Sequence, residues 1–174
     1  MIRPVAASDA RAIAELEVRA WRWAYTDVVP EERMITVDDR VARWEGRGAE
    51  GAFVAEVDGR VVGVVQVGPD PDDAAVGHIQ GLNVEPAAQG AGLGTALYEH
   101  AVGELLRAGH AAATLWVFAG NGHARGFYER RGWAPDGATG VAAEAPELRY
   151  RKNLRMTTSN AAAASGGPHP GHVR

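Results

Sequence analysis

The residues best suited to chemistry lie in a glycine-rich stretch, residues 82–96, which reads LNVEPAAQGAGLGTA. Gly90, Gly92 and Gly94 alternate in it, so the backbone carries little side-chain bulk and can turn successive N–H groups toward one point. A short apolar strand precedes the loop. A helical pattern follows it and directs its unpaired N-terminal amides and positive dipole end at the same point. This arrangement is typical of a binding site for phosphate or pyrophosphate.

The spacing of the glycines in the loop shows which known pattern of phosphate-binding loop it matches. The dinucleotide fingerprint G-x-G-x-x-G/A fails, because Thr95 or Leu97 stands where its last glycine or alanine is required. A Walker loop requires Gly-Lys-Ser/Thr, and this stretch has no lysine. The pattern that fits is Q/R-x-x-G-x-G/A, with Gln89, Gly92 and Gly94 at its defined positions. The alternative is a glycine-rich turn without a ligand.

A second stretch, residues 121–133, reads NGHARGFYERRGW and predicts a short helix that ends at a glycine. Asn121 stands between a strand and this helix, where its side-chain amide can cap the helix and reach a ligand. Ala124, Phe127, Tyr128 and Arg131 share one helical face. Phe127 is expected in the core, and core packing is also an alternative for Tyr128.

Both stretches resemble the acyl-CoA-binding motifs of the GNAT superfamily of N-acyltransferases. The loop, preceded by Leu82-x-Val84, resembles the pyrophosphate loop of that family, and residues 121–133 resemble its pattern N-x-x-A-x-x-F-Y-x-x-x-G-F/W. The resemblance implies acetyl-CoA as cosubstrate and direct attack of an amine on its thioester. The cofactor-binding residues that it implies are Leu82, Asn83, Val84, Gln89, Gly90, Ala91, Gly92, Leu93, Gly94, Thr95, Asn121 and Tyr128.

The resemblance also assigns roles in acyl transfer. Tyr128 matches the tyrosine that lies near the CoA sulfur and protonates the departing thiolate. Asn121 matches the asparagine that contacts the pantetheine arm or a water on it. Backbone N–H groups near Val84 would stabilise the charge that develops on the carbonyl oxygen.

The general base is the open part of this assignment. His78 stands six residues before Val84, where histone-acetylating relatives carry a glutamate, and a neutral histidine can accept a proton. The alternatives are a structural histidine and a base-free or water-relayed route. Glu85 follows the strand and is expected to face solvent. No metal site is expected, and His169 and His172 near the C-terminus are interpreted as solvated.

Composition limits the classes of protein to which the chain can belong. Its 174 residues suggest one domain with a sizeable core. The formal net charge of −4 does not suggest a nucleic-acid partner. Without cysteine, the chain has no disulfide, thiolate metal site or cysteine nucleophile. No run approaches the length of a membrane span, and the start of the chain has no apolar leader, so a cytoplasmic protein is expected. A homodimer is left open.

The order of predicted elements, β-α-α-β-β-β-α-β-α-β-β, agrees with the GNAT fold: a mixed, mostly antiparallel central sheet flanked by helices and splayed at the acyl-CoA site, in the α/β (α+β) class. We expect a domain over residues 1–154 and a flexible tail over 155–174. Ser8 is the expected N-cap of the first helix, and helical character is expected to fade from Trp21. Strands are expected at residues 2–5, 52–57, 60–67, 77–84, 113–118, 133–136 and 147–152, and further helices at 30–44 with a break near 36, 95–108 and 121–131. Residues 137–145 are expected to be a loop.

The sequence therefore predicts an acetyl-CoA-dependent N-acetyltransferase, an acyltransferase that acts on a primary amine of a small molecule. One alternative is the same chemistry on a protein or peptide amine. The other is an acyl-CoA-binding sensor without turnover. Retention of both the loop and Tyr128 favours turnover.

Overall fold

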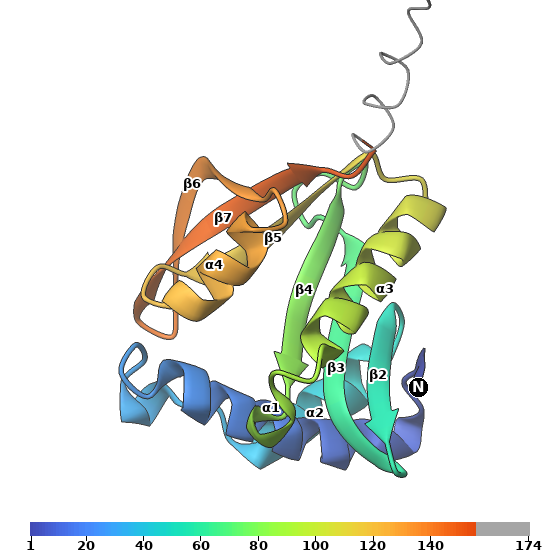
Figure 1. The fold of residues 1–174 in the computed structure, drawn as a ribbon. Helices are drawn as coiled ribbons and strands as arrows, with labels where there is room; N and C mark the ends of the chain where they lie inside the picture. The colour runs from blue at the N-terminus through green and yellow to red at the C-terminus, as the bar shows by residue number, and fades with distance from the viewer. Residues whose placement is uncertain (156–174) are drawn as a thin grey trace, which may run out of the picture.

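The computed structural model describes residues 1–155, which form a seven-stranded sheet in the order β1-β2-β3-β4-β5-β7-β6 (Figure 1). Within these residues β4 and β5 are the one parallel pair, and the other neighbours are antiparallel. The strands are β1 (Ile2–Pro4), β2 (Ala52–Val57), β3 (Arg60–Pro69), β4 (Gly77–Val84), β5 (Ala112–Phe118), β6 (Ala134–Ala142) and β7 (Ala145–Asn153). The predicted class and element order are confirmed.

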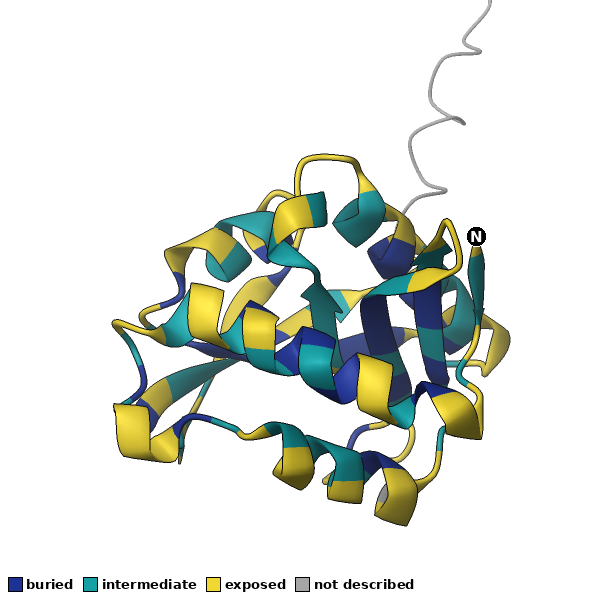
Figure 2. Ribbon diagram, turned by 90° about the horizontal axis from the view of Figure 1, so that it is seen from below, coloured by how far each residue is buried: buried dark blue, intermediate teal, exposed yellow. Residues whose placement is uncertain are grey.

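Helices cover both faces of the sheet. They are α1 (Ala10–Tyr25), α2 (Val37–Arg47), α3 (Leu93–Arg107) and α4 (Gly122–Glu129), with 3₁₀ turns at Ala7–Asp9, Glu31–Arg33 and Pro86–Ala88. On one face, α1 and α2 bury Ile13, Leu16 and Trp44 against β2 and β3. On the other, α3 and α4 bury a larger cluster that includes Leu97 and Tyr128. Figure 2 shows the burial on the strands and inner helix faces and the exposed outer faces.

The sheet opens between β4 and β5. Their parallel pairing covers three positions, from Gly77 opposite Ala113 to Ile79 opposite Leu115. At the next residue, Gln80, the register of β4 against β3 also shifts, which is the signature of a β-bulge. Beyond this point β4 remains paired with β3, and β5 with β7, but β4 and β5 diverge into a wedge.

The hairpin between β2 and β3 is confirmed at the predicted dipeptide. Asp58 and Gly59 both have positive φ, 49° and 72°, as a two-residue type I′ turn requires. The predicted break near Thr36 is also confirmed, because Thr36 is the N-cap of α2 and its side chain accepts a hydrogen bond from the Asp39 amide.

Two predictions at the N-terminal helix are wrong. Ser8 does not cap it, because residues 7–9 form a 3₁₀ turn that leads into α1. The helix also does not fade at Trp21 but continues through Tyr25. The rings of Trp21 and Tyr25 lie one helical turn apart, and their centroids are 4.8 Å apart. Both rings contact Phe118 on β5. Tertiary packing of the aromatic rings therefore outweighs their modest helix propensity.

The prediction of a loop over residues 137–145 is also wrong. Residues 134–142 form β6, and a turn at Ala143 and Glu144, both with positive φ, leads into β7. Glycine and alanine have low strand propensity, but the ladder with β7 supplies the hydrogen bonds that decide the conformation. The expected tail, residues 155–174, lies outside the described residues except for Arg155. Among the described residues, no helix has the length and apolar character that crossing a membrane requires.

Candidate functional site

The glycine loop ends at the N-terminus of α3 with its amides unused. Gly90 and Gly92 have φ of 84° and 78°, the left-handed region, and Gly92 is the N-cap of α3. No atom lies within 4 Å of a Cβ built on either glycine, so the loop borders open space. Loop hydrogen bonding stops at the Gln89 amide and resumes at Ala96, which donates to the Gly92 carbonyl. Among residues 1–155 the intervening amides have no hydrogen-bond partner, so they can bind an anion.

The edge of β4 presents further backbone groups to the wedge. The Glu85 amide donates to the Val62 carbonyl on β3 at 2.8 Å. In an antiparallel ladder, alternate residues direct their N–H and C=O groups to a given neighbour. Val84 and Leu82 therefore direct theirs away from β3, toward β5. The wedge is thus edged by polar groups that an extended ligand can pair with.

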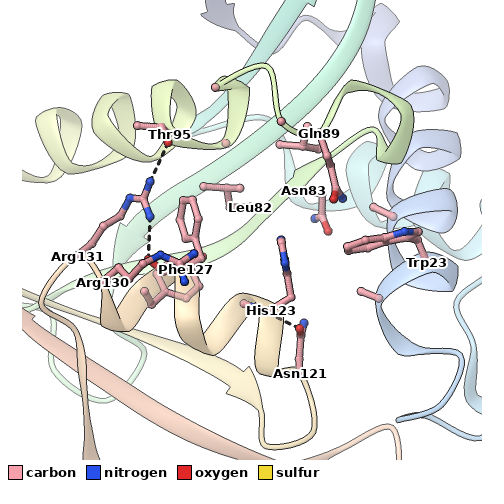
Figure 3. Close-up of a pocket in the computed structure, with 18 of the residues that line it drawn as sticks. Trp23, Leu82, Asn83, Gln89, Thr95, Asn121, His123, Phe127, Arg130 and Arg131 are labelled. Carbon is pink, nitrogen blue, oxygen red and sulfur yellow. Dashed lines mark hydrogen bonds between the residues drawn. The ribbon is translucent and has the colours of Figure 1, made fainter.

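Helix α4 forms the opposite side of the wedge. Asn121 caps it as predicted, with Oδ1 accepting from the Ala124 amide at 3.0 Å. Arg131, just beyond its C-terminus, donates to Thr95 Oγ1 at 2.7 Å and to the Phe127 carbonyl at 2.8 Å (Figure 3). Its guanidinium lies 3.7 Å from the centre of the Phe127 ring. Arg131 thereby connects the first turn of α3 to α4 and places a positive charge beside the glycine loop.

These elements enclose a cofactor-sized cleft of about 490 Å³. Ten of the predicted cofactor-binding residues line it: Leu82, Asn83, Val84, Gln89, Gly90, Gly92, Gly94, Thr95, Asn121 and Tyr128. Ala91 and Leu93 do not line it. Ala91 is exposed, and Leu93 packs against the core cluster under α3, so only their backbone groups belong to the loop.

A second cavity of about 250 Å³ lies at the same wedge and borders α1 and α2. Its aromatic walls are formed by Trp21, Tyr25, Trp44, Trp116, Phe118 and Tyr128. The cleft and this cavity share five lining residues, Tyr25, Leu82, Asn83, Ala124 and Tyr128. The two spaces therefore meet at Tyr128.

Tyr128 is 9% exposed, and its ring packs edge-on against Phe127 and Trp133. Within residues 1–155, its hydroxyl makes no hydrogen bond to another side chain or to the backbone. Burial raises the pKa of Tyr128 well above its usual value, so the phenol stays protonated at neutral pH. A buried, protonated hydroxyl at the junction of two cavities can donate a hydrogen bond to a ligand there.

His78 is not brought to this junction. It lies at the start of β4, about 20 Å along the strand from Val84 at the usual rise per residue. It lines a different cavity, with Gly68, Gln80, Glu104 and others. The structure therefore separates His78 from Tyr128.

Buried polar partners hold His78 in place. The Thr114 hydroxyl donates to the Asp70 carboxylate and lies 2.9 Å from His78 Nδ1, so Thr114 accepts a hydrogen bond from a protonated Nδ1. Burial lowers the pKa of His78, although Asp70 opposes that shift. His78 pairs with Thr114 next to the point where β4 and β5 separate. The hydrogen-bonded connection from Asp70 through Thr114 to His78 therefore lies directly below the wedge.

Several lining residues of the cleft were given no role from the sequence, notably His123, Arg130 and Arg131. Trp23 is 53% exposed on α1 and meets the His123 ring across the cleft at 5.4 Å. Arg131 shares a helical face with Tyr128, and that shared face is the signal that could have identified it. No group of three or more histidine and carboxylate side chains able to hold a metal occurs in residues 1–155.

Comparison with known proteins agrees with this geometry. The Acetyltransferase (GNAT) family model matches residues 11–133, and the chain belongs to that family. A mycothiol acetyltransferase of Beutenbergia cavernae is 44% identical over 63 residues, which cover 36% of this chain and 21% of that protein. The N-acetyltransferase YuaI of Bacillus subtilis is 26% identical over 69% of this chain and 72% of its own length. The chain thus spans about a fifth of the first of these relatives.

Solved structures share the fold. The PaiA N-acetyltransferase of Thermoplasma acidophilum, in complex with coenzyme A, superposes with a TM-score of 0.72 at 16% identity, over 88% of this chain and 98% of that one. The structure of yncA from Salmonella typhimurium, with its cofactor acetyl-CoA, superposes with a TM-score of 0.69 at 23% identity. The superposition covers 93% of this chain and 98% of that one. At these identities the similarity establishes the fold.

The burial of His78 predicts a specific pH dependence of stability. As the pH falls below about 6.5, the unfolded chain binds a proton at this histidine that the folded state resists, so the free energy of unfolding falls. We expect the melting temperature to fall more steeply from about pH 7.5 to about pH 5.5 in the wild type than in His78→Gln. The exposed His123→Gln is the matched control and should keep the wild-type slope. Identical slopes for the wild type and His78→Gln would contradict this account.

Proposed function

We propose that the protein is an acetyl-CoA-dependent N-acetyltransferase that transfers acetyl directly to the primary amine of a small molecule. The observation that carries this proposal is the junction of two cavities at Tyr128, in the wedge between β4 and β5. A donor in the cleft and an acceptor in the second cavity would meet there. The relatives named N-acetyltransferases and the family membership support the same reaction.

The residues of the cleft fit an acyl-CoA. The open space above Gly90 and Gly92 and the unused amides up to Thr95 suit its pyrophosphate. The edge of β4 from Leu82 to Val84 suits the amides of the pantetheine arm, which can pair with it as an added strand would. Solved relatives in the same fold contain coenzyme A or acetyl-CoA, which supports this assignment.

Acyl transfer at this junction needs few protein groups. The amine nitrogen attacks the thioester carbonyl carbon, and the bond from that carbon to sulfur breaks. The backbone N–H of Val84, directed into the wedge, would donate to the carbonyl oxygen as negative charge develops on it. The neutral Tyr128 hydroxyl would donate its proton to the departing thiolate. Most of the rate would come from holding the two substrates in line.

His78 has no part in this proposed mechanism, because it lines another cavity and its Nδ1 is engaged by Thr114. Glu85 also has another partner, since Arg19 on α1 holds its carboxylate through bonds of 2.7 to 3.1 Å. The sequence-based assignment of His78 as the base therefore gains no support from its position.

The size and walls of the second cavity favour a small acceptor over a protein. A volume of about 250 Å³ between α1, α2 and the sheet accommodates a small molecule. Relatives named for the small molecule mycothiol support the same choice, over 60% of this chain in the Thermomonospora curvata and Streptomyces avermitilis proteins. A sensor without turnover would not need a second cavity that opens on Tyr128.

Binding of the cofactor can be tested at Gly94. A Cβ at this position lies 3.7 Å from the Phe127 ring and 3.8 Å from Val84, so the leucine of Gly94→Leu would extend into the cleft. We expect calorimetry to show that CoA binds the wild type and binds this variant at least tenfold more weakly, a loss of about 1.4 kcal/mol. Gly46→Leu on the exposed side of α2 is the control. Wild-type affinity in Gly94→Leu would remove the loop from the cofactor site.

The role of Tyr128 can be tested with Tyr128→Phe, which keeps the ring packing and removes the hydroxyl. If Tyr128 protonates the thiolate, kcat should fall by about a hundredfold while the affinity for acetyl-CoA stays near that of the wild type. Steady-state kinetics with an amine identified from a substrate panel would measure this. A raised KM for acetyl-CoA with an unchanged kcat would instead assign Tyr128 to cofactor packing.

A further inference from the structure

The charged groups on the wall of the second cavity are Glu17, Arg40, Arg43 and Glu147. Arg40 donates to both carboxylate oxygens of Glu17, whose Oε2 also accepts from Trp44 Nε1 at 2.9 Å. This buried cluster connects α1 to α2 and satisfies its own charges. Arg43 lies with its guanidinium 6.0 Å from the Trp44 ring.

Glu147 differs from these groups. In the described part of the chain, its carboxylate makes no hydrogen bond and no ion pair with another side chain or the backbone. Arg149, two residues along the same face of β7, is already paired with Asp136 at 2.7 Å. Among the described residues, Glu147 therefore brings a carboxylate without a side-chain or backbone partner to a cavity in which Glu17 is paired with Arg40 and which Arg43 also lines.

The neighbouring strands position this carboxylate. Glu147 pairs with Phe118 on β5 and with Gly140 on β6. A Cβ on Gly140 would lie 3.0 Å from Glu147 Oε1 and 3.3 Å from the Trp116 ring, so the glycine leaves room for both side chains. Phe118 in turn contacts the rings of Trp21 and Tyr25. The carboxylate thus lies on a cavity wall that also carries these aromatic rings, and burial raises its pKa.

We propose that Glu147 binds the ammonium group of the acceptor in the second cavity and accepts its proton, and that the acceptor is a small primary amine with an aromatic or apolar arm. This inference rests on the proposed acetyl transfer. A carboxylate supplies the charge complement of an ammonium, and the faces of tryptophan and tyrosine attract a cation as well as an apolar arm. Glu147 and Tyr128 line the same cavity, so the amine would lie between its base and the thioester.

The proton balance is as follows. The acceptor ammonium gives one proton to the Glu147 carboxylate and becomes a neutral amine. The amine nitrogen forms a bond to the acetyl carbon, and the carbon–sulfur bond breaks. The thiolate gains a proton from Tyr128, which becomes a phenolate. The nitrogen loses its second proton as the amide forms, and this proton converts the phenolate back to the neutral phenol. Glu147 then returns its proton to solvent.

The test uses two indole compounds that differ in charge, tryptamine and tryptophol, with protein saturated with CoA. We expect calorimetry to show that the wild type binds tryptamine at least about tenfold more tightly than the neutral tryptophol. Glu147→Gln should lose this preference. Glu144→Gln is the matched control, because Glu144 is exposed and paired with Arg33, and it should keep the preference. Equal binding of both compounds by the wild type, or an unchanged preference in Glu147→Gln, would overturn the assignment.

Turnover supplies a second readout that a structural role would not change. With tryptamine, kcat/KM of Glu147→Gln should fall by about a hundredfold near neutral pH. It should then rise about tenfold per pH unit up to about pH 9, because the free-base fraction of an amine with a pKa near 10 rises in that way. The wild type should respond much less to pH. A Glu147→Gln variant with the kcat/KM and pH profile of the wild type would overturn the assignment.

Failure of the proposed function is distinguishable from failure of this inference. A wild type that binds no CoA, or that acetylates no amine in a broad panel, would refute the acetyltransferase assignment. A wild type that binds CoA and acetylates other amines, but neither binds nor acetylates tryptamine, would refute only the acceptor class and the role of Glu147.

Discussion

The parting of β4 and β5 is the constraint on which the rest of the structure depends. Three paired positions hold the strands together, and the connection from Asp70 through Thr114 to His78 lies within them. Above them the two strands diverge, and unpaired backbone groups on β4 face an open wedge. At the far end of β4, Arg19 on α1 forms a salt bridge with Glu85, so the diverging strand is fixed at both ends. Without this divergence there would be no groove for an extended cofactor.

The helices on the two faces turn this opening into a site with two cavities that meet at Tyr128. On the α3 and α4 side, the glycine loop, the helix N-terminus and Arg131 present partial or full positive charge to an anionic cofactor. On the α1 and α2 side, the cavity wall carries aromatic rings, the Arg40–Glu17 pair, Arg43 and Glu147, and we propose that Glu147 binds the acceptor amine there. Tyr128 lies where the two meet. In this proposal acetyl-CoA enters the cleft and the amine enters the second cavity, and the two substrates meet at Tyr128.

Local sequence patterns were sufficient where local physics decides the structure. The positive-φ glycines of the loop, the hairpin at Asp58 and the cap at Asn121 follow from residue type and spacing. The end of α1, the strand over residues 134–142 and the location of His78 depend on partners distant in sequence. Glu147 is similar, because its isolation becomes visible only when the partners of Glu17 and of Arg149 are known. The family pattern suggested His78 on β4 as the base, with a structural histidine or a water-relayed route as alternatives, whereas we propose a carboxylate on β7.

Amide hydrogen exchange with and without acetyl-CoA would test the central claim most directly, because it reads the backbone groups that the wedge exposes. The account predicts that acetyl-CoA slows exchange at the amides of residues 90–95 and at Val84, on the two sides of the cleft. Residues 50–53 and 66–68, around the cavity that His78 lines, should not change. Unchanged exchange in the loop and at Val84, or protection confined to the cavity near His78, would contradict it.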